Sequence, residues 1–106
     1  MKIYHKDHAL LSAFLIREAD DYDWRPETKL GNRRKFISKM RKMIISNLEK
    51  IEGGADYICI RSISNMGLTT RELRLTPVEW SSRRLVIINL PPNPRNGGIN
   101  ISIKDK

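Results

Sequence analysis

The sequence YICIRSISNMGLTTRELRL, residues 57–75, decides between two folds. Its first part is rich in β-branched and aromatic side chains, which favours a strand over 57–63. Thr69 and Glu72 then have the spacing of a capping box, in which the hydroxyl and the carboxylate accept hydrogen bonds from free backbone amides at the start of a helix. We therefore predict a short helix over 69–75.

The segment that follows predicts one more short helix and a hairpin. The sequence TPVE at 76–79 is another capping box, with proline at the favoured first helical position, and it predicts a helix over 77–84. A β-rich run at 85–90 and the alternation of isoleucine with polar residues over 99–103 predict two strands. The residues between them, 91–98, are mostly Pro, Asn and Gly, which favours a turn.

Two longer helices are predicted before this region. Over 7–19, Asp7 is a good N-cap and apolar residues recur at helical spacing. Over 33–51, an apolar stripe is preceded by Asn32 as a cap and followed by two glycines. The polar segment 20–32 between the two helices is predicted to be a loop.

Together these elements predict an α+β fold with a single domain spanning 1–106. It has two N-terminal helices, a short strand, two short helices and a C-terminal β-hairpin. The alternative is two helices packed on a four-stranded antiparallel sheet. In that case residues 65–67 form the turn between strands 57–64 and 68–75.

From residue 33 onward, the preferred order of elements resembles the winged helix-turn-helix fold of DNA-binding proteins. The sequence NMGLTTREL at 65–73 is similar to the Gly-Leu-Thr/Ser turn that recurs in helix-turn-helix motifs. In the common pattern this turn joins the two helices, whereas here it precedes a short helix. Two helix pairs therefore compete, one of 58–66 with 69–75 and one of 69–75 with 77–84, and the β character of the first segment favours the second pair.

The resemblance implies that one helix enters the major groove while the hairpin loop contacts the backbone or the minor groove. The arginines that it places for such contacts are Arg71, Arg74, Arg83, Arg84 and Arg95.

A second argument for a phosphate site does not depend on that fold. Arg33, Arg34 and Lys35 occupy the first turn of the predicted helix 33–51, where each cation opposes the helix dipole at a cost of a few tenths of a kcal/mol. Free amides at a helix N-terminus together with three cations form a phosphate site. Further cations at Lys39, Arg41 and Lys42 extend the positive surface. The alternative is a solvated face.

Charge and composition restrict the class of protein. The net charge of +8 and the pI of about 10.0 favour an anionic partner. A single cysteine, Cys59, excludes an intramolecular disulfide, and its two isoleucine neighbours predict a buried thiol that suits a reducing cytoplasm. No apolar run approaches the ~20 residues of a membrane span and no secretory signal is recognised, so we expect a cytoplasmic protein without a membrane partner.

Catalytic and metal chemistry find little support. His5 and His8 are too few for a closed zinc site, and the aspartates at 20–23 lack the glycine and glutamate of a calcium loop. The sequence has neither a nucleophile elbow nor a glycine-rich phosphate loop. We therefore expect no metal, no cofactor and no enzymatic activity.

The preferred hypothesis is a nucleic-acid-binding protein, specifically a duplex DNA-binding transcriptional regulator or accessory factor of winged-helix type. The apolar stripe of helix 7–19 belongs either to the core or to a homodimer interface. The alternative hypothesis is a small phage- or plasmid-type interaction or inhibitor protein whose basic face docks on an acidic partner protein.

Overall fold

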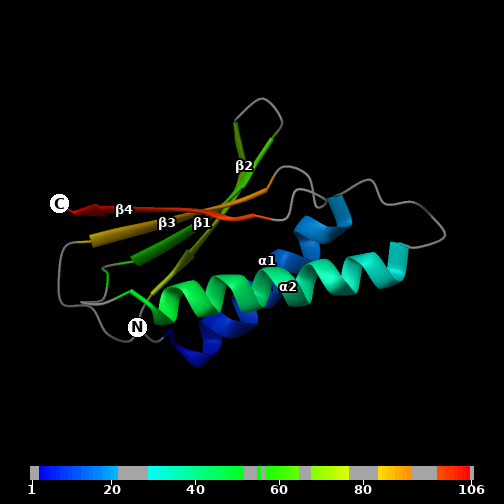
Figure 1. The fold of residues 1–106 in the computed structure, drawn as a ribbon, viewed down its shortest axis with the longest axis horizontal. Helices are drawn as coiled ribbons and strands as arrows, with labels where there is room; N and C mark the ends of the chain where they lie inside the picture. Colours follow the sequence, from blue (N-terminus) through cyan, green and yellow to red (C-terminus); the bar gives the residue numbers. More distant parts are fainter. Residues whose placement is uncertain are drawn as a thin grey trace.

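The computed structural model describes residues 3–21, 29–51, 55, 57–64, 68–76, 84–91 and 98–105. Two helices, α1 (His5–Asp21) and α2 (Lys29–Glu49), precede four strands, β1 (Tyr57–Ile63), β2 (Thr69–Leu75), β3 (Arg84–Leu90) and β4 (Asn100–Asp105). Figure 1 shows the two helices crossing each other beside the sheet. The predicted α+β class is confirmed.

The four strands form one mixed sheet in the order β2-β1-β3-β4. The outer pairs β1–β2 and β3–β4 are antiparallel, whereas the central pair β1–β3 is parallel, with Ile58 opposite both Leu75 and Val86. The strand β3 lies on the opposite side of β1 from β2, and it runs in the same direction as β1. The antiparallel alternative is therefore correct for the two outer pairs and wrong for the central pair.

The helix predicted over 69–75 is wrong, because these residues form β2. Leu73 and Leu75 alternate with Glu72 and Arg74, and this period of two places the leucines on the inner side of the sheet, where Leu75 is buried. Pairing with β1 supplies the backbone hydrogen bonds that the capping box would have supplied in a helix.

The strand β2 also removes the helix pair of the helix-turn-helix motif in both competing forms, since each requires a helix over 69–75. The ends of the β1–β2 hairpin are closed by a hydrogen bond from the Ser64 amide to the Leu68 carbonyl (2.8 Å). The predicted turn at 65–67 lies outside the described residues. So do residues 77–83 of the predicted second helix, and Arg84 begins β3.

Both long helices begin earlier than predicted. Asp7 lies within the first turn of α1 and is not its N-cap; its carboxylate accepts a hydrogen bond from the Thr76 amide (3.2 Å), at the end of β2. Because α2 begins at Lys29, the predicted cap Asn32 lies inside that helix, as do the last residues of the predicted loop 20–32, of which 22–28 lie outside the described residues.

The core lies between the two helices and one side of the sheet. Its most buried side chains come from every element except β4: Leu11, Leu15, Met40, Ile44, Leu48, Ile58, Ile60, Leu75, Val86, Ile88 and Leu90. Burying such a side chain contributes about 1.5–3 kcal/mol. The apolar stripe predicted in 7–19 is divided between core and surface, because Leu10 and Ile16 are 46% and 42% exposed.

Neither of the helices that the structure describes is at once long and apolar enough to cross a lipid bilayer.

Candidate nucleic-acid interface

The two sides of α2 differ sharply in chemistry. Its inner side buries four apolar residues spaced four apart: Phe36, Met40, Ile44 and Leu48. With 3.6 residues per turn, the positions about half a turn away face solvent. Five exposed residues there, Arg34, Lys35, Ser38, Lys39 and Lys42, are called the basic stripe below.

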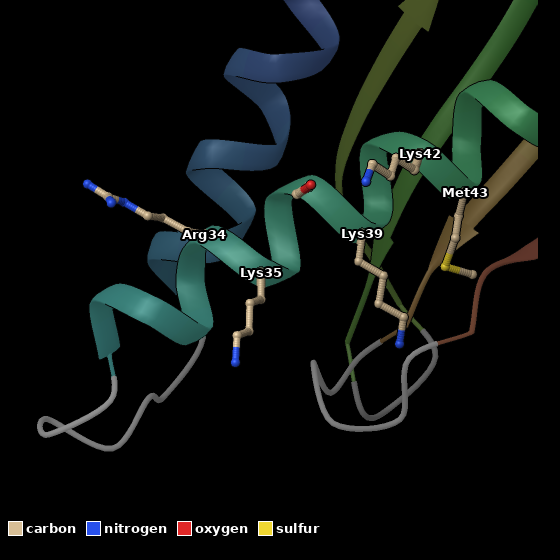
Figure 2. Close-up of a pocket in the computed structure, with 6 residues that line it drawn as sticks. Arg34, Lys35, Lys39, Lys42 and Met43 are labelled. Atoms are coloured by element: carbon tan, nitrogen blue, oxygen red, sulfur yellow. The ribbon is translucent and has the colours of Figure 1, made fainter.

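The basic stripe lines an open hollow of about 540 Å³ together with Met43. Figure 2 shows Lys35 and Lys39 pointing in the same direction, while Arg34 points away from them. Eight steps of about 1.5 Å separate Arg34 from Lys42, so the stripe spans about 12 Å along the helix axis. Cations that spread out in this way suit an extended anion, whereas a small anion requires cations that converge on one point.

The cations of the basic stripe form no ion pair with an acid in the part of the chain that the structure describes. Among the residues that the structure describes, no carboxylate lies within ion-pair distance of Arg34, Lys35, Lys39 or Lys42. Lys35 and Lys39 are four residues apart on the helix, a spacing at which like charges repel. The positive potential of this face is therefore available to an external partner.

The predicted cluster of Arg33, Arg34 and Lys35 does not lie at the start of α2, because this helix begins at Lys29. These residues lie in the second turn and not in the first, so the interpretation that they surround the free amides of the helix N-terminus is wrong. Arg34 and Lys35 belong to the basic stripe. Arg33 instead contacts α1, where its guanidinium pairs with Asp20 at 2.7 Å.

Arg71 also connects parts of the fold. Its two terminal nitrogens bind Glu18 (2.6 Å) and Asp21 (2.7 Å) of α1, and the Glu18 side chain is only 4% exposed. The hydrogen bond with Asp21, followed by that with Glu18, raises the pKa of Arg71 above its usual range. Arg71 therefore joins β2 to α1.

Of the remaining predicted arginines, the two that the structure describes do not join the basic stripe. Arg74 is 72% exposed, binds Glu72 at 3.1 Å and lies 5.9 Å from the centre of the Tyr57 ring. Arg84 pairs with Asp105 at 2.9 Å across β3 and β4. Arg83 and Arg95 lie outside the described residues. Of the eight predicted contact residues, the structure thus brings Arg34 and Lys35 together with Lys39 and Lys42.

Arg41, which the sequence analysis added to the positive surface, holds the two helices together. One guanidinium nitrogen donates to the His8 carbonyl (3.1 Å) and the Ser12 hydroxyl (2.7 Å), and the other lies 3.2 Å from His8 Nδ1. A signal for this role is present in the sequence. Position 41 lies four residues after Ile37 and three before Ile44, at the edge of the apolar stripe.

Two buried acids have structural roles that the sequence analysis did not predict. Asp7 and Glu18 are 2% and 3% exposed, and both bind groups of β2 or its end. Both occupy the apolar side of α1, since Asp7 precedes Leu11 by four residues and Glu18 follows Phe14 by four. An acid at such a position indicates a buried partner elsewhere in the chain.

Comparison with known proteins supplies no relative from which a function could be transferred: no protein-family model, no curated protein and no solved structure matches this chain.

Proposed function

We propose that this protein binds nucleic acid through the basic stripe of α2, mainly by contacts with phosphates. The observation that carries the proposal is the set of four exposed cations on one side of one helix, none of them within ion-pair distance of a carboxylate among the described residues. Duplex DNA carries one charge per about 1.7 Å of its axis. A stripe about 12 Å long therefore faces several phosphates at once.

The kind of cation favours nucleic acid over protein as the partner. Lysine is depleted at protein–protein interfaces, where aromatic residues, methionine and arginine are enriched. Interfaces with nucleic acid are more polar and much more positive. Three of the four cations in the basic stripe are lysines, and none of its members is aromatic.

Docking on an acidic protein is the second candidate. The observation in its favour is β2, because a strand at this position belongs to the alternative fold of two helices on a four-stranded sheet and not to the winged-helix fold that implies DNA binding. The composition of the basic stripe places this candidate second.

The proposed mode of binding uses phosphate contacts from α2, and residues 69–75, which form β2, supply no recognition helix. Phosphate contacts position a protein on a duplex without reading its sequence. We therefore propose a regulatory or accessory factor with little sequence preference on duplex DNA. The buried thiol of Cys59, 2% exposed, suits the reducing cytoplasm in which we propose that it acts.

The test is a fluorescence-anisotropy titration of a labelled duplex over a range of salt between about 50 and 200 mM. We expect the logarithm of the affinity to fall linearly with the logarithm of the salt concentration. The double variant Lys35→Gln/Lys39→Gln should bind more weakly and lose about two units of that slope, about 0.9 per phosphate contact.

The matched control is Lys6→Gln/Lys104→Gln, which removes the same charge from exposed positions on α1 and β4. It should leave the slope nearly unchanged, and circular dichroism should show that both variants are folded. Equal weakening by both variants would mean that net charge, and not the basic stripe, attracts the DNA. If neither duplex nor single-stranded DNA or RNA binds, docking on an acidic protein becomes the leading candidate.

A further inference from the structure

A second hollow adjoins the basic stripe where α1 and α2 meet. It has a volume of about 490 Å³ and shares Ser38 and Lys42 with the first hollow. Its other walls include His8 from α1 and Ile45, Ser46 and Glu49 from α2. Volumes between about 300 and 1,000 Å³ are typical of sites for small organic groups.

The imidazole of His8 is held in place by Arg41. Because a guanidinium only donates hydrogen bonds, the contact of 3.2 Å from Arg41 requires His8 Nδ1 to accept. Arg41 is itself fixed by the His8 carbonyl and the Ser12 hydroxyl, so the flat face of the ring is fixed too.

The groups around this hollow complement a nucleotide. Lys42 and Ser38 offer a cation and a hydroxyl to a phosphate, in line with the basic stripe. The His8 ring offers a stacking face and Ile45 an apolar wall for a base. At the far end the Glu49 carboxylate accepts hydrogen bonds and, when ionised, cannot donate them.

We propose that this hollow holds the base of an unpaired nucleotide whose phosphate lies on Lys42, and that it prefers bases with an exocyclic amino group. This inference rests on the proposed function and adds a ligand class to it. A base inside a duplex is stacked on both faces and paired along its edge, so only an unpaired base is free to turn out into such a hollow.

The preference for an amino group follows from Glu49. At position 4 of the ring cytosine carries an amino donor and thymine a carbonyl oxygen, so a carboxylate that faces this position accepts from cytosine and repels thymine. Glu49 is exposed and has no ion-pair partner among the described residues, so its carboxylate is available to a ligand.

The experiment compares labelled oligodeoxycytidine and oligodeoxythymidine of equal length at one salt concentration. The natural protein should bind the cytidine oligonucleotide at least about fivefold more tightly. Glu49→Ala removes a negative charge, so it should tighten binding of the thymidine oligonucleotide and reduce the preference to about one. Circular dichroism checks that this surface variant is folded.

Two outcomes would overturn the inference while the proposed function stands. One is equal binding of the two oligonucleotides by the natural protein, with Lys35→Gln/Lys39→Gln weakening both. The other is a Glu49→Ala variant that tightens both alike and keeps their ratio, since Glu49 would then act only as a distant charge. If neither oligonucleotide nor the duplex binds, the proposed function fails and the inference fails with it.

Discussion

Replacing Arg71 with methionine tests whether this arginine stabilises the fold or contacts nucleic acid. The substitution keeps much of the side-chain volume and removes the charge that binds Glu18 and Asp21. Glu18, 4% exposed, would then be a buried carboxylate without its cation. The winged-helix resemblance instead places Arg71 at the nucleic acid. A structural role predicts that the substitution lowers stability and leaves binding unchanged, whereas a nucleic-acid contact predicts the reverse.

The expected loss of stability follows from burial. Removing one partner of a buried ion pair costs about 3–5 kcal/mol. Arg71 and Asp21 are 29% and 61% exposed, so water screens part of the network, and we expect a loss of about 2–3 kcal/mol. With a urea dependence of about 1–3 kcal/mol per molar, the unfolding midpoint should fall by about 0.7–3 M.

The assay is urea unfolding followed by circular dichroism for Arg71→Met, Glu18→Gln and the double variant. Because the second substitution removes the unpaired charge, the double variant should lose less stability than the sum of the single variants, by at least about 1 kcal/mol. The salt slope of DNA binding should stay unchanged in folded Arg71→Met. A loss below about 0.5 kcal/mol, strict additivity or a slope reduced by about one would refute the structural role.

Two further predictions concern stability. Gly31 lies within α2, and a Cβ added there would meet nothing within 4 Å. Gly31→Ala should therefore raise the free energy of unfolding by about 0.5–1 kcal/mol. A decrease in the urea midpoint would contradict this. Hydrogen bonds, first with the Cys59 thiol and then with Arg74, lower the pKa of Glu72 below its usual range. A carboxylate with a lowered folded pKa stabilises the fold above its unfolded pKa and loses that contribution as the pH falls through the folded value. The difference in unfolding midpoint between the natural protein and Glu72→Gln should therefore be constant near neutral pH and shrink below about pH 4.5, whereas a difference independent of pH would exclude this contribution.

The elements with strong local patterns were predictable from the sequence, and β2 was not. The apolar spacing of α2 and the isoleucine alternation of β4 each fit one structure only. In β2, Thr69 and Glu72 fit a helix cap, while the alternation of Leu73 and Leu75 with charged residues fits a strand. Pairing with β1 decides between them. This is an interaction between segments, and local propensity does not contain it.

The candidate site was predictable in outline because it lies on one helix with a strong local pattern. The charges at positions 33–42 identify a basic helix, and its apolar spacing indicates which of them face outward. Sequence alone cannot show which arginines find a carboxylate, because the partners are distant along the chain. Glu18 and Arg71 are 53 positions apart.

Arginines and lysines have different roles among the described residues, so net charge alone does not show which cations are available to an external partner. Every ion pair among the described residues is formed by an arginine, whereas the basic stripe is mostly lysine. A planar guanidinium holds a carboxylate in fixed geometry, which suits contacts within a fold, and a hydrated ammonium on a flexible stem suits phosphates that shift along a backbone. Repulsion within the stripe, as between Lys35 and Lys39, costs about 0.2–0.5 kcal/mol per pair in the free protein. A polyanion that neutralises the stripe would remove that cost on binding, and this relief of repulsion favours the proposed contact with nucleic acid.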